Sequence, residues 1–85
     1  MASNYKNLTA TAWVKEGAGK LCGIFVASTT SGTIKVWDQT SAAAPVLVNT
    51  FTPAAATYYP FPDVAFTRGL FITIANTIDC TVYYE

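Results

Sequence analysis

Apolar and polar residues alternate along several short stretches of the chain, and turn-forming residues separate these stretches. Alternation with a period of two is typical of strands that bury one face, and these stretches are rich in the strand-favouring residues Val, Ile, Thr, Phe and Tyr. Short strands with frequent turns between them are typical of an antiparallel sandwich or small barrel. The pattern predicts strands at 8–14, 20–28, 33–38, 46–52, 58–61, 69–76 and 78–84, with 64–66 as an optional short eighth.

The alternation also predicts which residues face the core. In 33–38, Ile34 and Val36 share one face, while Lys35 and Trp37 share the other. The last two strands show the same regularity, with inward sets Leu70, Ile72 and Ile74, and then Ile78, Cys80, Val82 and Tyr84. We therefore expect Trp37 on the outer face of its sheet, which is an unusual place for a large aromatic side chain.

The strand at 20–28 departs from the alternation because both of its faces are apolar. Its two sides carry Cys22, Ile24 and Val26, and Leu21, Phe25 and Ala27. Two apolar faces predict that this strand is covered on both sides. One cover is the opposite sheet, and the other is a loop or a partner subunit.

No segment carries the sustained 3.6-residue apolar period of a helix, and the alanine clusters 42–44 and 54–56 are too short to form one. The expected fold class is all-β, with a single small antiparallel β-sandwich of about seven or eight strands at 8–85. A flexible N-terminal arm is expected at 1–7. Pro60 and Pro62 favour a sheet edge for 57–63, because proline has no N–H to donate to a ladder.

Composition changes this picture mainly through charge. Only 12% of the 85 residues are charged, and the formal net charge is zero, whereas a typical soluble domain has about 25% charged residues. The chain lacks the basic patch of a nucleic-acid-binding protein and the apolar run of roughly 20 residues that a membrane helix needs. So weakly charged a surface has two interpretations: Thr, Ser and Ala make it polar enough for a free monomer, or much of it is covered in an oligomer or larger assembly, which is the one we favour.

Catalytic chemistry has few candidates here. The chain has no histidine, the commonest general base and metal ligand. Asp38, Asp63 and Asp79 lie beside predicted turns, where aspartate ordinarily caps backbone N–H groups. Cys22 and Cys80 fall on predicted inward faces as small hydrophobic residues. The chain start lacks a secretory signal, so we expect cytosolic synthesis and free thiols, although neighbouring strands would allow a bridge. We expect no enzymatic activity, no metal and no cofactor.

Aromatic residues remain as candidates for binding. Trp37 with Lys35 beside it admits three interpretations: packing at the end of the sandwich with the indole N–H bonded to a carbonyl, an anchor in a protein interface, or a sugar-binding platform. The same reasoning extends to the doubly apolar strand and to the Tyr pair at 58–59. The candidate interface residues are Trp37, Lys35, Phe25, Tyr58 and Tyr59.

The chain contains, in this order, the segments GKLCGIFV, SGTIKVWDQTSAA, YYPFPDVAFTRGLFITI and DCTVYYE. Together, these four segments resemble small β-proteins encoded among the virion genes of tailed bacteriophages. The shared features are a GIxV strand, a GTIKVWD strand ending in TSAA, an aromatic turn with FP, a GL-x-ITI strand and a closing TVYY strand. The resemblance covers 19–85. It implies a compact sandwich, with a jelly roll as one form, and a structural virion protein without enzymatic activity.

The resemblance implies a place on the capsid exterior. There the chain would act as a decoration or cement protein that assembles as a homotrimer, contacts the major capsid protein and stabilises the head, after synthesis in the bacterial host cytoplasm. Two alternatives stay open: a glycan- or host-recognition module on a tail or fibre, and a neck or tail-completion protein. The resemblance assigns no functional residue by position.

Overall fold

The computed structural model describes residues 4–85, and within them the chain forms six β-strands and no helix. The strands are β1 (Asn4–Leu8), β2 (Ala12–Glu16), β3 (Gly19–Trp37), β4 (Val46–Phe51), β5 (Thr57–Phe66) and β6 (Gly69–Tyr84). Every pair of neighbouring strands is antiparallel. The all-β antiparallel fold expected from the sequence is confirmed. In this part of the chain, no helix is available to span a membrane.

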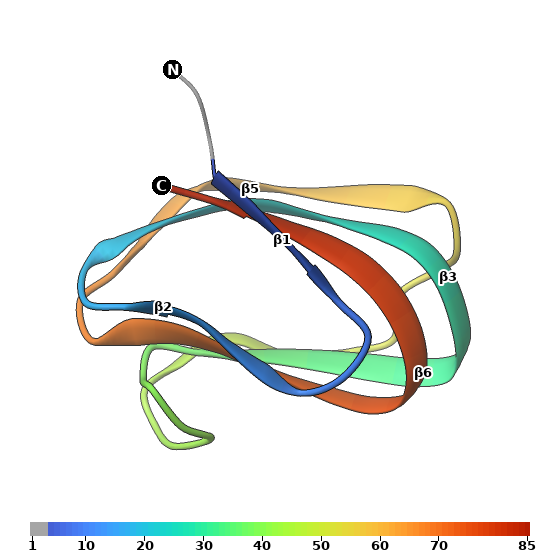
Figure 1. Cartoon of the computed structure of the whole chain (residues 1–85), viewed down its shortest axis with the longest axis horizontal. Helices are drawn as coiled ribbons and strands as arrows, with labels where there is room; N and C mark the ends of the chain where they lie inside the picture. Colours follow the sequence, from blue (N-terminus) through green and yellow to red (C-terminus); the bar gives the residue numbers. More distant parts are fainter. Residues whose placement is uncertain (1–3) are drawn as a thin grey trace.

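Two strands, β3 and β6, are long and bent, and each passes from one layer of the molecule to the other (Figure 1). Pairing between them is interrupted from Thr30 to Thr33, around Ser31. β6 bends at Asn76, whose φ of 63° lies in the left-handed region that asparagine tolerates. The Asn76 side chain donates a hydrogen bond to the Ser31 carbonyl at 2.7 Å, which ties the two bends together.

The bends divide the strands into two layers that pack face to face. The first sheet has the order β1, C-terminal half of β6, N-terminal half of β3, β5. The second sheet has the order β2, N-terminal half of β6, C-terminal half of β3, β4. We number the strand segments along the chain and count each half of β3 and of β6 as a separate segment. In these numbers, neighbouring segments follow the order 1-8-3-6 in the first sheet and 2-7-4-5 in the second. This is the order of an eight-stranded jelly roll, which was one of the forms expected for the sandwich.

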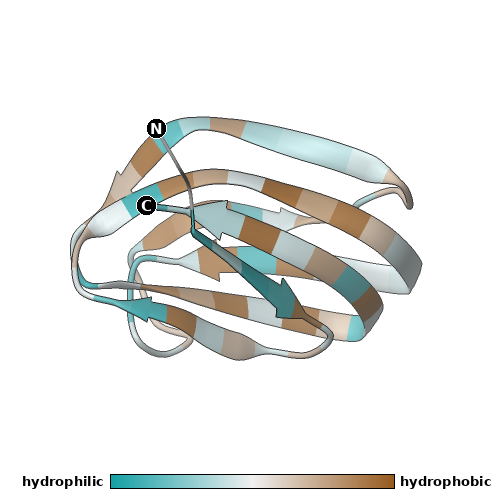
Figure 2. Ribbon diagram, turned by 45° about the horizontal axis from the view of Figure 1, so that its top comes forward, coloured by the Kyte–Doolittle hydropathy of each residue, from teal (hydrophilic) through white to brown (hydrophobic). Residues whose placement is uncertain are grey.

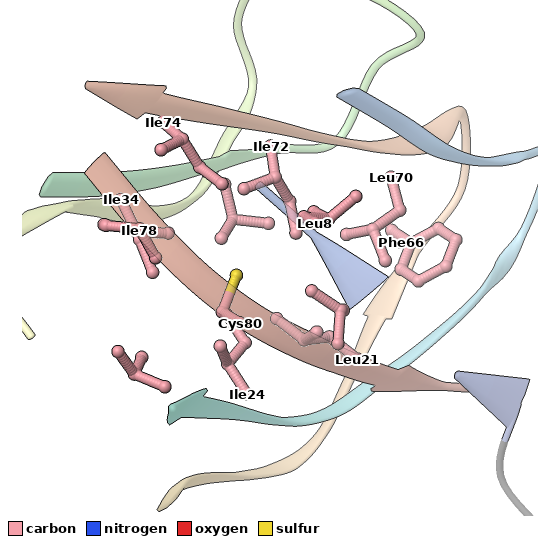
Figure 3. Close-up of a cluster of buried hydrophobic side chains, with 13 residues drawn as sticks. Leu8, Leu21, Ile24, Ile34, Phe66, Leu70, Ile72, Ile74, Ile78 and Cys80 are labelled. Atoms are coloured by element: carbon pink, nitrogen blue, oxygen red, sulfur yellow. The ribbon is translucent and has the colours of Figure 1, made fainter. Parts of the chain in front are cut away.

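The core lies between the inward faces of the two sheets (Figure 3). Figure 2 shows hydrophobic and hydrophilic positions alternating along the long strands that supply it. The fully buried side chains are Leu21, Ile24, Val26, Ile34, Val36, Phe66, Leu70, Ile72, Ile78, Cys80 and Val82. Burial stabilises the fold by about 1.5–3 kcal/mol for each large apolar side chain. The inward faces predicted for 33–38, 69–76 and 78–84 are confirmed, with Tyr84 half-buried at the margin of the core.

Strand boundaries differ from the expectation at the N-terminus. The predicted strand 8–14 is broken, because β1 ends at Leu8 and β2 begins at Ala12 in the other sheet. Residues 4–7, which the sequence placed in a flexible arm, belong to β1 and pair with Thr81–Tyr84 of β6. Residues 1–3 of that arm lie outside the described residues. Polar residues are tolerated in β1 because it is an edge strand with one face in solvent.

Elsewhere the sequence predicted separate strands where the structure has continuous ones. The predicted strands 20–28 and 33–38 are the two halves of β3, and 69–76 and 78–84 are the two halves of β6. Likewise 58–61 and 64–66 join in β5. Among residues 4–85, β5 pairs only with β3 and is an edge strand, as the prolines indicated. The polar and glycine residues at these junctions mark bends within a strand, and sequence signals for a bend resemble those for a turn.

A bulge in β3 overturns one predicted face. The register of β3 against both β5 and β6 shifts between Leu21 and Gly23. Leu21 therefore faces the core together with Ile24, and both are fully buried. Cys22 is half-buried and lies on the outer side. Its predicted inward position was wrong, because strict alternation does not anticipate the extra residue of a bulge.

Candidate interaction surfaces

Four apolar side chains form a row across the outer face of the second sheet, one from each strand. Trp13 of β2 lies opposite Phe71 of β6, and Phe71 lies opposite Trp37 of β3. Trp37 in turn lies opposite Val46 of β4. Directly opposed residues of antiparallel strands project from the same face of a sheet. The register therefore brings these four residues, the outer row, side by side.

The outer row is only partly covered by the chain itself. Trp13 and Val46, at its two ends, are 48% and 41% exposed. Phe71 and Trp37, at its centre, are half-buried. Contiguous exposed apolar side chains on a soluble domain commonly mark a surface that contacts another molecule.

Trp37 is held in a fixed orientation within the outer row. Its indole Nε1 donates a hydrogen bond to Thr73 Oγ1 at 2.9 Å. Lys35 Nζ lies 4.4 Å from the centre of the ring, within the range of a cation–π contact. Both residues lie on the outer face, as expected, and the indole partner is a threonine hydroxyl instead of the carbonyl that the packing interpretation assumed. Because Lys35 covers one side of the ring, Trp37 resembles an oriented anchor more than an open sugar platform.

The first sheet carries a second aromatic surface on its outer face. Cys22, Phe25, Tyr58 and Tyr83 line a shallow hollow of about 360 Å³. Phe25 lies directly opposite Tyr58 on the neighbouring strand. The rings of Tyr58 and Tyr83 meet edge to face, with centroids 6.2 Å apart. Tyr5 of β1, which is 73% exposed, lies opposite Tyr83 and extends the aromatic surface to the sheet edge.

Gly23 explains how Tyr58 reaches across the sheet. A Cβ atom built on Gly23 would collide with the ring and hydroxyl of Tyr58. The missing side chain therefore leaves the space that the tyrosine ring occupies. The bulge next to it turns Cys22 outward, so both local irregularities of β3 help to shape the hollow. The doubly apolar strand of the sequence is thus covered inside by the core, while on its outer side aromatic rings flank Phe25 and Ala27 is exposed.

Tyr59 does not share the surface of Tyr58. It is half-buried and packs against the core, with its ring edge to face with Phe51 at 5.4 Å between centroids. Its hydroxyl accepts a hydrogen bond from the Ala54 backbone N–H at 2.7 Å. Tyr59 and Phe51 also line a smaller hollow of about 190 Å³ between the edge strands β4 and β5. The structure thus separates the five candidate residues into Trp37 with Lys35, Phe25 with Tyr58, and an inward Tyr59.

Asp38 has a structural role at the end of β3. Its Oδ1 accepts hydrogen bonds from the backbone N–H groups of Arg68 at 2.8 Å, Thr67 at 3.0 Å and Gly69 at 3.4 Å. Burial alone would raise the pKa of the Asp38 carboxyl, but the hydrogen bonds from Arg68, Thr67 and Gly69 outweigh it and hold that pKa below its usual value. The predicted capping role is confirmed here, since the carboxylate fastens the β5–β6 turn to β3.

The other two aspartates are arranged differently. Asp79 accepts a hydrogen bond from the side-chain amide of Asn7 at 2.9 Å, which joins β1 to β6. Asp63 is exposed, with a φ of 47°, at an irregular point of β5.

The two cysteines lie on opposite sides of the first sheet and are both free. Cys80 points into the core, where burial, with a smaller contribution from the neighbouring Asp79, raises the pKa of its thiol to about 11. Cys22 faces outward and lies 4.0 Å from Glu85 Oε2. The strands that carry them are neighbours, but a bridge is impossible because the sheet separates the two sulfur atoms.

Cys22 also belongs to a small polar group beside the hollow. Its Sγ and the carboxylate oxygens of Asp63 and Glu85 lie within 4.8 Å of one another. Within residues 4–85, no further histidine, cysteine or carboxylate joins this group. A structural zinc site has four such ligands. The group therefore brings two negative charges to the margin of an aromatic surface without completing a metal site of that kind.

No family model matches the chain, and comparisons with curated proteins and with solved structures find no match. A functional proposal for this chain therefore depends on its own surfaces and fold.

Sequence reasoning found part of each surface and missed the rest. Trp13 and Tyr83 count among its aromatic residues, but its candidate interface contains Trp37 without Trp13, Phe71 or Val46, and Phe25 and Tyr58 without Tyr83. The alternation did place Tyr83 outward, whereas nothing in the sequence indicates that Trp13 and Trp37 lie in one row. That row follows from strand order and register, which join positions far apart in the chain.

Proposed function

We propose that this chain is a non-enzymatic structural protein that works by binding neighbours through its sheet faces, as a decoration protein on the head of a tailed bacteriophage. The single observation that carries the binding role is the outer row, in which Trp13, Phe71, Trp37 and Val46 lie exposed or half-buried across all strands of one sheet. Trp and other aromatic residues dominate the energetics of protein interfaces.

The fold supports this proposal without specifying the partner. Jelly rolls occur in capsid proteins and in lectins, so the architecture is compatible with the role but does not select it. The assignment to a phage head depends on the resemblance of 19–85 to virion proteins. The partners proposed on that basis are the major capsid protein and further copies of this chain, in a trimer.

A decoration protein stabilises a shell through contact area. A standard interface buries about 800 Å² on each partner, close to a fifth of the 4451 Å² that this chain exposes. Repeated contacts on a symmetric shell add avidity, because each bound copy raises the effective concentration of the next contact. No reactive group is needed for this role.

Substitution of Trp37 by alanine tests the role of the outer row. We expect assembly and head binding to weaken by about 30-fold, the effect of a 2 kcal/mol hot spot, with a smaller effect on folding because the side chain lies outside the core. Analytical ultracentrifugation of the chain and cosedimentation with intact heads measure the two associations. Phe51→Ala is the matched control, since it removes a half-buried ring that faces inward. The proposal would be refuted if the wild-type chain were monomeric and did not cosediment with intact heads.

Copy number in virions separates a decoration protein from the neck or tail-completion alternative. Quantitative mass spectrometry of purified virions would give hundreds of copies for a protein that covers the head. A ring-like number, such as six or twelve, would move the protein to the neck or tail.

A further inference from the structure

The hollow on the first sheet combines two features that together favour a positively charged guest. Three of its walls are the aromatic side chains Phe25, Tyr58 and Tyr83. The fourth, Cys22, has the carboxylate oxygens of Asp63 and Glu85 within 4.8 Å of its Sγ. Aromatic faces attract cations through the ring quadrupole, and carboxylates attract them directly.

We propose that this hollow receives an arginine side chain of a partner protein. The guanidinium group stacks on an aromatic ring and donates hydrogen bonds to a carboxylate at the same time, whereas a lysine ammonium acts as a compact point charge. The aliphatic stem of arginine suits the apolar remainder of the hollow. Asp63 comes from β5 and Glu85 follows β6, so the two carboxylates approach one site from two elements of the sheet.

The openness of the site favours a side chain over a free small molecule. Sites for free ligands are concave and bury most of the ligand, whereas this hollow is a shallow depression on a sheet face. A side chain held by a protein partner needs less enclosure, because contacts around it hold it in place. On the opposite face of the molecule, Lys35 lies over Trp37 at 4.4 Å, which shows a cation on an aromatic ring in this same fold.

The inference depends on the proposed function only in taking the arginine from a protein partner. Its test uses the isolated chain and no heads, so the two proposals fail independently. N-acetyl-arginine amide is titrated into the protein while the aromatic ring signals are followed by NMR. N-acetyl-citrulline amide, which has nearly the same shape and no charge, is the matched probe.

Saturable shifts of the Tyr58 and Tyr83 rings with the arginine probe, at least about tenfold weaker with citrulline, would support the site. The double variant Asp63→Asn, Glu85→Gln should reduce the arginine response to the citrulline level, and Tyr58→Ala should abolish it. Asp79→Asn on the same sheet, whose carboxylate partners Asn7, should leave it unchanged. The double variant conserves side-chain shape, so it keeps the test valid if Tyr58→Ala fails to fold.

Three results would overturn the inference. Equal binding of arginine and citrulline would make the hollow a merely apolar surface. Shifts that spread over the whole molecule without saturation would show that it is not a site. Saturable binding of a neutral sugar or of Zn²⁺ at these rings, without an arginine response, would assign the hollow to a different ligand.

Discussion

Replacing Asp38 tests whether one buried carboxylate fastens the β5–β6 turn to the end of β3. Asp38 is 8% exposed, and its two shortest hydrogen bonds come from the N–H groups of Arg68 and Thr67, at 2.8 and 3.0 Å. A hydrogen bond to a charged group contributes about 1.5–3 kcal/mol. Counting only these two bonds at the lower end of that range, we expect Asp38→Ala to lower the free energy of unfolding by about 3 kcal/mol.

Asparagine at this position should cost less. Its carbonyl oxygen still accepts hydrogen bonds from the turn, but it has no charge, so we expect a loss of about 1–2 kcal/mol. A domain of 85 residues has a total stability of only about 4–13 kcal/mol. Both variants should therefore be easily distinguished from wild type by urea denaturation followed by tryptophan fluorescence.

The pH dependence gives a sharper test, because the Asp38 pKa is lower in the folded chain than in the unfolded one. The stabilising contribution is then fully present above the unfolded pKa, about 3.9. It is lost as pH falls through the folded pKa. The difference in unfolding free energy between wild type and Asp38→Asn should be constant from about pH 5 to 7 and shrink below about pH 4.

Asp63→Asn is the control for this experiment. Asp63 is exposed, and asparagine tolerates its φ of 47°, so its replacement should change stability little. A loss below 0.5 kcal/mol for Asp38→Ala, or an Asp38→Asn difference that is the same at pH 2.5 and pH 7, would refute the role assigned to this carboxylate.

Two further predictions concern the core and the thiols. Gly32→Ala should lower the unfolding free energy by about 1–3 kcal/mol, because its Cβ would collide with the Ile78 side chain at the bend of β3. Urea denaturation measures this loss of stability, and a variant with the same denaturation midpoint as wild type would contradict the prediction. Gly17→Asn is the control, since no atom beyond its chain neighbours lies within 4 Å of a Cβ built at Gly17 and asparagine tolerates its φ of 85°. In the folded chain at pH 8, a thiol-specific disulfide reagent should label Cys22 readily. It should label Cys80 only upon unfolding, because that thiol is buried and its pKa is raised to about 11. Equal labelling rates for the two cysteines in the native state would show that the buried position of Cys80 is wrong.

Residues 33–38 show which structural features the sequence predicts correctly. The alternation of side chains along any strand assigns Ile34 and Val36 to the core, and Lys35 and Trp37 to the outer face. That assignment needs no knowledge of neighbouring strands. The same argument failed at Cys22, where a bulge shifts the alternation by one position, and it missed the continuity of β3 and β6 through their bends.

The sequence by itself determined the all-β class, the inward faces of most strands and the scarcity of catalytic groups, because these depend on local periodicity and residue type. Only the tertiary structure decided which outer residues become neighbours. Trp13, Phe71 and Trp37 meet because β2, β6 and β3 pair in one register. Phe25, Tyr58 and Tyr83 meet because β3 lies between β5 and β6. Register depends on bulges, bends and core packing along the whole chain, so both candidate surfaces are properties of the assembled sandwich.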